Sequence, residues 1–215
     1  SSTMLVDLCD KISIKKINKK KDEIIFIGPF KKNIKSNINT VTEALLILRS
    51  QNFVSHKKRY KIVINKRIPV FAGLGGGTGN AAAIIKYFLK NKISSKLLEV
   101  FEKKIGSDLR LFFLNHSFQL NLKKIKTFKK KYEFYFLLFY PNIKSSTKEV
   151  YSKVKKFNLP LAIDPSKISS NDKYNKFLMN EANDLQMIVE KKHKKIQIIL
   201  NLIKTQKNCL FSRMT

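Results

Sequence analysis

The chain has 215 residues, 43% of them apolar, so it is long enough for a substantial core and unlike a disordered protein in composition. Its longest apolar run, residues 134–140, is too short to span a bilayer, and its first residues do not have the pattern of a signal peptide. The formal net charge is +29, although only five of the 44 basic residues are arginine.

The positive charge comes from lysines spread along the whole chain. Arginine, whose planar guanidinium binds phosphates and bases in two-point contacts, would be expected at a dedicated nucleic-acid site. Lysine is accompanied here by abundant isoleucine and asparagine, which share its A/T-rich codons, so genome composition accounts for the charge. We therefore expect no specific nucleic acid and no membrane as partners, only nonspecific attraction of polyanions.

The cysteines and histidines form no recognisable metal or catalytic pattern. Cys9 and Cys209 lie near opposite ends of the chain, so a disulfide framework is not expected and a reducing cytoplasm is the predicted location. His56, His116 and His193 have no carboxylate or cysteine at a useful spacing. We interpret them as structural or surface residues.

The first half of the chain mixes strand and helix patterns. Short apolar or alternating segments predict strands at residues 11–17, 22–28 and 60–66. Helical spacing of apolar residues predicts helices at residues 39–51, 80–90 and 94–106. Asn39 is a suitable cap at the start of the first helix, and Gly106 at the end of the third. A further helix is predicted over residues 107–115, starting at Ser107 or Asp108.

The second half continues this mixture. It has strand patterns at residues 117–122, 133–140 and 208–212, and helix patterns at residues 147–157, 181–190 and 194–204. Between the first two strands lies a basic stretch that we interpret as a solvated crossing and as a domain boundary near residue 130. Because strands and helices do not alternate strictly, we predict an α+β architecture of two halves, residues 1–130 and 131–215.

Five of the seven glycines lie between Gly73 and Gly79, in the sequence FAGLGGGTGNAAA of residues 71–83. The order strand, glycine-rich turn, helix suits phosphate binding, because a helix N-terminus presents unpaired N–H groups and a partial positive charge. Glycines let phosphate oxygens reach those groups, and the alanines at 81–83 keep the first turns narrow. A glycine-rich turn without a ligand is the alternative.

Two other phosphate-binding loops fit less well. The P-loop requires a lysine after its last glycine, and no lysine follows a glycine here. The strict dinucleotide-binding pattern fails as well. Its looser form matches at Gly77, Gly79 and Ala82, but the acidic residue expected about 20 positions later would be Glu102, inside a predicted helix rather than at a strand end.

The stretch PVFAGLGGGTGNAAA, residues 69–83, resembles the phosphate-binding motif of the GHMP kinase superfamily, the small-molecule kinases of galactose, homoserine and mevalonate. Its triple glycine is most similar to the branch that acts in the non-mevalonate isoprenoid (terpenoid) pathway. Four further stretches resemble that branch in the same order: MLVDLCDKI, IGSDLRLFF, YPNIKSSTKEVY and NDLQ. The resemblance covers essentially the whole chain.

This resemblance implies the two-half α+β GHMP kinase fold, with a ribosomal-protein-like N-terminal half that binds ATP and a ferredoxin-like C-terminal half, both incomplete. It implies ATP and Mg²⁺ as cofactors, and phosphorylation of the 2-hydroxyl of a cytidine-diphosphate-linked polyol by a monomer or weak homodimer. The ATP-binding residues implied are Pro69, Ala72, Gly73, Leu74, Gly75, Gly76, Gly77, Thr78, Gly79, Asn80 and, near the adenine, Asn39. The Thr78 hydroxyl is expected beside phosphate or Mg²⁺.

Asp108 aligns with the family's catalytic aspartate, which accepts the proton of the attacking hydroxyl. From the bare sequence the alternative is an ordinary aspartate that caps a helix. Another GHMP enzyme, such as a homoserine kinase, is the alternative kinase. A basic nucleic-acid-binding protein is the alternative outside enzymes.

The sequence departs from the family pattern at several points. Thr78, Gly79 and Asn80 stand where the family has Ser-Ser-Asp, and Arg110 replaces a proline. Stretches matching the family's lysine-bearing first strand, its Tyr-His segment and its final Gly-Ser-Gly motif are not found. We therefore expect an internal fragment of a longer gene product, inactive on its own.

Overall fold

The computed structural model describes most of the chain: residues 1–32, 34–35, 37–90, 92–121, 124–128, 132–143, 145, 147–155 and 164–215. These residues form two compact units, residues 1–125 and 126–215. Helices and strands are mixed in the chain, and the predicted α+β class is confirmed. The predicted division near residue 130 lies outside the described residues.

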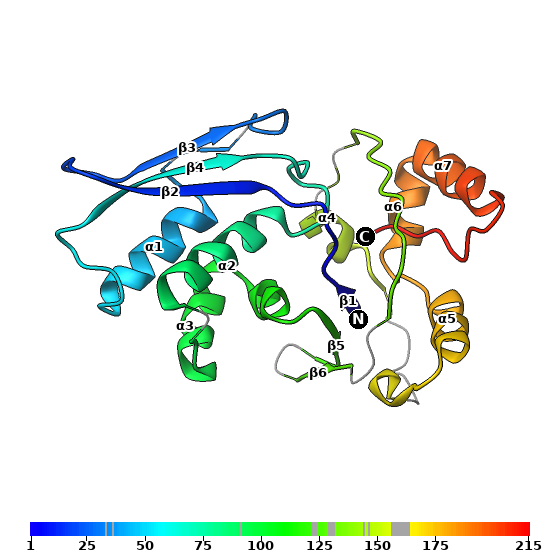
Figure 1. Ribbon diagram of the computed structural model, residues 1–215. Coiled ribbons are helices and arrows are strands. Elements are labelled where there is room, and N and C mark those ends of the chain that lie inside the picture. The colour runs from blue at the N-terminus through cyan, green and yellow to red at the C-terminus, as the bar shows by residue number, and fades with distance from the viewer. Residues whose placement is uncertain are drawn as a thin grey trace. The chain divides into compact units, whose positions relative to one another are not determined.

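The first unit is built on a three-stranded sheet in the order β2-β4-β3 (Figure 1). The bounds of these strands are Lys11–Ile17, Arg59–Asn65 and Glu23–Ile27. The central strand β4 is antiparallel to β2 and parallel to β3. Ile62 and Ile64 of β4 are fully buried and alternate with less buried residues, as a strand with one face in the core requires. The sequence predictions of all three strands are confirmed to within one residue.

Three helices pack on one face of this sheet, as Figure 1 shows: α1 (Thr40–Ser50), α2 (Gly76–Leu89) and α3 (Ser95–Ile105). Asn39 caps α1 as predicted, because its Oδ1 accepts hydrogen bonds from the backbone N–H groups of Val41 and Thr42, each at 3.0 Å. Gly106 ends α3, also as predicted. Fully buried side chains from the helices and the sheet form one core, including Ala44, Leu48, Ile62, Ile64, Ala81, Ile84, Ile85 and Phe101.

Helix α2 begins at Gly76, four residues before the predicted start. Gly75 has a left-handed backbone (φ +62°) and stands as the residue before the helix, so the chain passes directly from the glycine turn into the first helical turn. Glycine weakens a helix interior by about 1 kcal/mol relative to alanine, which is why propensity alone placed the start at Asn80. Tertiary packing outweighs this low propensity: Asn80 and Ala81 are buried, 6% and 0% exposed, and hold the start of the helix in place.

Two smaller elements complete the first unit. The predicted helix at 107–115 is a 3₁₀ helix, η1 (Ser107–Phe113), which begins after Gly106. The second is a small sheet in which β1 (Ser2–Met4) pairs with β5 (His116–Gln119), whereas β6 (Ile125–Thr127) begins at the last residue of this unit. Strand β1 pairs with β5 in antiparallel register. Neither β1 nor β6 was predicted, because three residues are too few to show a pattern; residue 122 of the predicted strand 117–122 is not described.

The second unit is mostly helical: α4 (Thr147–Ser152), η2 (Pro165–Lys167), α5 (Asn171–Asn180), α6 (Gln186–Lys192) and α7 (Lys194–Lys204). The helix predicted at 194–204 is confirmed, whereas that predicted at 181–190 begins only at Gln186. Residues 156–157 of the helix predicted at 147–157 are not described. The strands predicted at 133–140 and 208–212 are wrong, because both segments are irregular. In the first of them Tyr135 is fully exposed.

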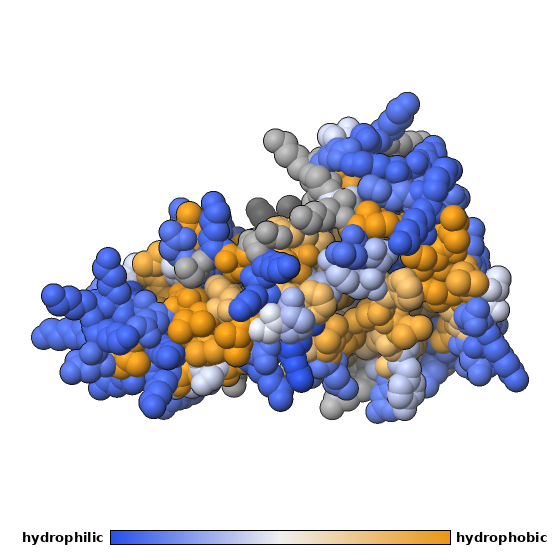
Figure 2. All heavy atoms as spheres, turned by 90° about the horizontal axis from the view of Figure 1, so that it is seen from above, coloured by the Kyte–Doolittle hydropathy of each residue, from blue (hydrophilic) through white to orange (hydrophobic). Residues whose placement is uncertain are grey.

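The molecular surface carries both polar and apolar side chains. On the face drawn in Figure 2, hydrophilic side chains cover much of the visible surface, with apolar side chains exposed between them. No helix in the described part of the chain is long and apolar enough to cross a membrane.

Replacing a core leucine of α1 should destabilise the first unit. Leu48 is 0% exposed, so Leu48→Ala should lower the free energy of unfolding by about 2–5 kcal/mol, measured by urea denaturation. Leu46 lies on the same helix but is 55% exposed, and Leu46→Ala should change it by less than about 0.5 kcal/mol. Equal effects of the two substitutions would show that the core is misplaced.

Candidate functional site

The N-terminus of α2 emerges from the glycine turn without a side chain of its own to cap it. Gly73 and Gly75 both have positive φ angles, +74° and +62°, which side-chain-bearing residues rarely adopt. Gly75 supplies no capping side chain, and the first turn contains no acidic residue. The N–H of Gly79 closes the first turn by donating to the carbonyl of Gly75 at 2.8 Å. Such a helix end favours an anion, because its partial positive charge is not neutralised by an acidic residue of the first turn.

Two of the glycines are required by protein packing. A Cβ atom on Gly75 would lie 2.7 Å from the ring of Phe112, and one on Gly79 would lie 2.9 Å from the same ring. The missing side chains of these two glycines therefore leave room for the Phe112 ring of η1, and not only for a phosphate. Gly77 differs, since its Cβ would lie 3.4 Å from the Thr40 hydroxyl and the residue is exposed. Thr40 Oγ1 in turn donates to the Gly77 carbonyl at 2.7 Å, which joins α1 to α2.

A buried ionic cluster lies under the glycine turn. Asp10 Oδ2 accepts hydrogen bonds from Lys66 Nζ and, at 2.8 Å, from Asn80 Nδ2. Asp10 Oδ1 accepts from the backbone N–H groups of Arg67 and Ile68, at 2.7 and 2.9 Å. The side chains of Asp10 and Lys66 are 0% and 4% exposed. Burial alone would raise the pKa of Asp10, but these four hydrogen bonds outweigh it and lower the pKa below its ordinary value.

Asp108 lies exposed in the first turn of η1. The alternative that it caps this helix is wrong, because Gly106 occupies the cap position and its carbonyl accepts from the N–H of Leu109 at 3.2 Å. Leu109, the next residue, is fully buried and anchors the segment in the core. The Asp108 carboxylate is thus presented on a fixed backbone.

The neighbouring Arg110 explains one departure from the family pattern. Its guanidinium donates two hydrogen bonds, at 2.9 and 2.8 Å, to the carboxylate of Glu102 on α3, and this partner raises the pKa of Arg110. Arg110 therefore fastens η1 to α3. The dinucleotide-binding alternative is not supported, because its expected acidic residue, Glu102, is occupied by this ion pair.

Helix α2 and η1 are also joined through the last turn of α2. Lys86 Nζ donates to the carbonyl of Phe112 at 2.6 Å and lies 5.2 Å from the ring centre of Phe113. Burial lowers the pKa of Lys86. The Phe112 ring lies against Gly75 and Gly79, so the segment that follows Asp108 lies beside the glycine turn, and the Lys86 contact holds the same segment along α2.

The structure places the remaining predicted ATP ligands in or beside the same turn. Pro69, Ala72 and Leu74 are half-buried in the segment between β4 and α2, and Thr78 is half-buried in the first turn of α2. Asn39 is engaged as a helix cap, and its Nδ2 also donates to the Lys35 carbonyl at 3.0 Å. Contacts of these residues with ATP, and of Thr78 with Mg²⁺, stay predictions.

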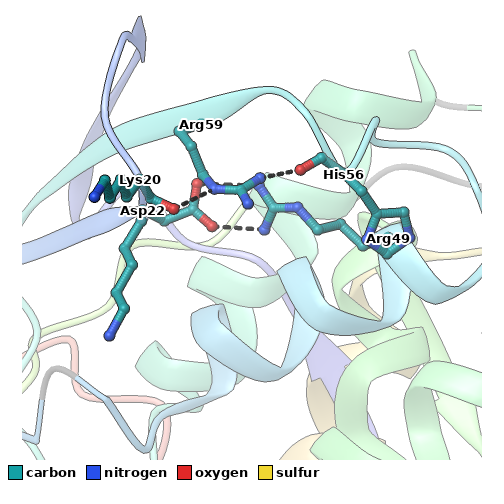
Figure 3. A pocket seen from close by; sticks show the side chains of 6 residues that line it. Lys20, Asp22, Arg49, His56 and Arg59 are labelled. Carbon is teal, nitrogen blue, oxygen red and sulfur yellow. Dashed lines mark hydrogen bonds and ion pairs between the residues drawn. The ribbon is translucent and has the colours of Figure 1, made fainter.

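Two surface depressions lie elsewhere in the first unit. One of about 640 Å³ runs between β3 and α1, and another of about 220 Å³ is lined by Lys20, Lys21, Asp22, Arg49, His56 and Arg59. In the smaller one, Arg49 donates to both carboxylate oxygens of Asp22 at 2.5 and 3.0 Å (Figure 3). Arg59 donates to the carbonyls of Lys20 and His56. These cations hold loops together, so we place the candidate site at the glycine turn.

The histidines provide no competing site. His56 lines the smaller depression, His116 lies in β5 with its pKa lowered by burial, and His193 separates α6 from α7. Across the residues with a described placement, no group of three or more His, Cys, Asp or Glu side chains could hold a metal ion.

Comparison with known proteins assigns the family. The model of the GHMP kinases N terminal domain matches residues 39–108, which contain the glycine turn and Asp108. The 4-diphosphocytidyl-2-C-methyl-D-erythritol kinase of Pelagibacter ubique (strain HTCC1062) is 36% identical over 215 residues, and the match covers 98% of this chain and 74% of the relative. The chain belongs to the 4-diphosphocytidyl-2-C-methyl-D-erythritol kinase family.

Further matches agree with this family. The kinase of the same name from Buchnera aphidicola subsp. Schizaphis graminum (strain Sg) is 31% identical, over 80% of this chain and 58% of the relative. A crystal structure of 4-(cytidine 5'-diphospho)-2C-methyl-D-erythritol kinase superposes with a TM-score of 0.62 at 19% identity, over 92% of this chain and 70% of that one. A homoserine kinase structure from Cytophaga hutchinsonii reaches a TM-score of 0.50 at 18% identity, and the match covers 70% of this chain and 53% of that one. These two likenesses show the GHMP kinase fold.

The glycines of the turn should differ in their tolerance of alanine. Gly75→Ala should lower the free energy of unfolding by about 1–3 kcal/mol, because its Cβ overlaps the Phe112 ring and its φ is positive. Gly77→Ala should change it by less than about 1 kcal/mol, since alanine favours the helix and the nearest atom is 3.4 Å away. Urea denaturation of both variants measures the difference, and equal losses would contradict the role given to Phe112.

Proposed function

We propose that this chain transfers the γ-phosphoryl group of ATP to the 2-hydroxyl of 4-diphosphocytidyl-2-C-methyl-D-erythritol, the reaction of its family in isoprenoid biosynthesis. The observation that carries the proposal is the exposed N-terminus of α2, which follows a turn of glycines and has no capping side chain. Family membership supports the choice of this reaction over other phosphate chemistry.

The first turn of α2 suits a triphosphate. Its N–H groups and partial positive charge would bind phosphate oxygens, and the exposed Gly77 adds no side chain in their way. ATP, when bound, supplies the phosphoryl group. The large positive charge of the chain would draw both anionic ligands toward the protein.

Mg²⁺ would be held in part by the ligands that it accompanies. It commonly keeps several waters and takes only one or two carboxylates beside substrate phosphates, so a dedicated cluster of acidic side chains is not required. The Thr78 hydroxyl, in the first turn of α2, is the protein group that we assign to it. The ion, when bound, would neutralise phosphate charge.

Asp108 is the group that we assign to the proton of the attacking hydroxyl. Its carboxylate is exposed and its backbone is fixed by buried Leu109. The Phe112 ring holds the same segment against the glycine turn. A carboxylate in this position can accept the hydroxyl proton while the helix end holds the phosphates. We also propose a cytoplasmic location, supported by the free thiols of Cys9 and Cys209.

Valine at Gly77 should abolish ATP binding without unfolding the chain. Its branched side chain would extend beside the exposed first turn, where we place phosphate oxygens, and the nearest protein group that it meets is the half-buried Thr40 side chain, 3.4 Å from a Cβ at this position. Calorimetric titration should show at least a tenfold loss of ATP affinity, with the unfolding curve little changed. Leu46→Ala is the matched control and should bind ATP normally. Unchanged ATP affinity in Gly77→Val would contradict the proposal that the phosphates of ATP bind at this turn.

In a full-length version of the protein, asparagine at Asp108 should lower the turnover number by about 100-fold or more with little change in ATP affinity. It keeps the size of the side chain but cannot accept a proton. Steady-state kinetics with the cytidine-containing polyol measure the effect of Asp108 on turnover. The same assay with homoserine as the acceptor tests which substrate the enzyme uses. A fall in the turnover number of less than about tenfold would show that Asp108 is not the proton acceptor and that catalysis depends on substrate positioning and electrostatics.

A further inference from the structure

The buried carboxylate of Asp10 connects every segment that leads into the glycine turn. It accepts hydrogen bonds from Lys66 at the end of β4, from the backbone of Arg67 and Ile68, and from Asn80 in α2. Asp10 itself comes from the segment before β2. One carboxylate thus holds both ends of the turn, the exit from β4 and the start of α2.

The groups held by Asp10 form the surface on which the turn rests. A Cβ on Gly76, the first residue of α2, would lie 3.3 Å from Lys66 Nζ and 3.1 Å from the Ile68 side chain. Lys66 and Ile68 are therefore in contact range of the helix start. Any displacement of these side chains would reach the N–H groups of the first turn directly.

We propose that Asp10 is a positioning residue of the ATP site, which fixes the N-terminus of α2 through Lys66, Ile68 and Asn80 without touching ATP. This inference rests on the proposed function, because it assumes that ATP binds at the glycine turn. It assigns the ion pair a role in ligand affinity in addition to stability.

The chain contains a matched ion pair that lacks this role. Asp22 accepts two hydrogen bonds from Arg49 and one from the backbone N–H of Tyr60 at 2.8 Å. It lies in the same unit and its side chain is 18% exposed, but its partners belong to α1 and β4 and not to the glycine turn. Replacing Asp22 therefore also breaks an ion pair and lowers stability, but at a position away from the glycine turn.

The loss of the negative charge of Asp10 and the loss of its hold on the first turn of α2 predict opposite changes in ATP affinity for Asp10→Asn. Removing a negative charge near the phosphates should strengthen ATP binding if charge alone mattered. If position matters, the freed Lys66 and Asn80 let the first turn shift, and binding weakens. The sign of the change in affinity therefore separates the two explanations.

The experiment measures ATP affinity by calorimetry and amide hydrogen exchange in the whole chain for Asp10→Asn and Asp22→Asn. We expect Asp10→Asn to weaken ATP binding at least tenfold and to speed exchange at least tenfold at Arg67, Ile68, Gly79 and Asn80, whose N–H groups are hydrogen-bonded. Asp22→Asn should leave ATP affinity within about twofold and this exchange unchanged. If Asp10→Asn does not fold, the double variant Asp10→Asn/Lys66→Met removes both buried charges together and should fold with the same weakened binding and faster exchange.

Unchanged or tighter ATP binding in Asp10→Asn, or an equal loss in Asp22→Asn, would overturn the positioning role. If the unsubstituted chain binds no ATP, the proposed function fails. The exchange measurement still decides the structural half of the inference, because it reports whether the first turn of α2 depends on Asp10 without any ligand. Unchanged exchange in the folded Asp10 variants would then overturn it.

Discussion

The buried ion pair of Asp10 and Lys66 is the interaction on which the candidate site depends. A charge taken out of water costs several kcal/mol, so the carboxylate must be paired and fully hydrogen-bonded. Asp10 meets this condition with four donors, and all four belong to segments that border the glycine turn. The requirement to satisfy one buried charge thus fixes the exit of β4 and the start of α2 together.

The glycine cluster serves protein packing and ligand space at once. Gly75 and Gly79 make room for the Phe112 ring, whereas Gly77 faces the Thr40 hydroxyl and lies exposed. Because Phe112 and Asp108 belong to the same short helix, the packing that requires two of the glycines also holds the helix of the proposed proton acceptor against the turn. Arg110 and Lys86 hold this helix to α3 and α2. The departures from the family pattern at Gly79 and Arg110 therefore have structural partners in this chain.

Local sequence patterns predicted the sheet and helices of the first unit but not the contacts that build the site. Strands β2, β3 and β4 and the cap at Asn39 followed from periodicity and capping preference, which act over a few residues. Lys66 and Asp10 are 56 residues apart, and among so many lysines nothing local marks the one that is buried. The segment 133–140 has the composition of a strand, yet a strand forms only beside another, and none pairs with it within the described residues. The glycine motif could be recognised from the sequence, because its residues are consecutive in the chain.

The central claim is that the first turn of α2 holds the phosphates of ATP, and the amide chemical shifts of this chain test it most directly. In a titration of isotope-labelled protein with ATP, we predict the largest and saturable shifts at the amides of Gly73 to Asn80, where backbone N–H groups would bind phosphate oxygens. Shifts confined to the basic depression of Lys20, Arg49 and Arg59, with the glycine amides unmoved, would contradict the account.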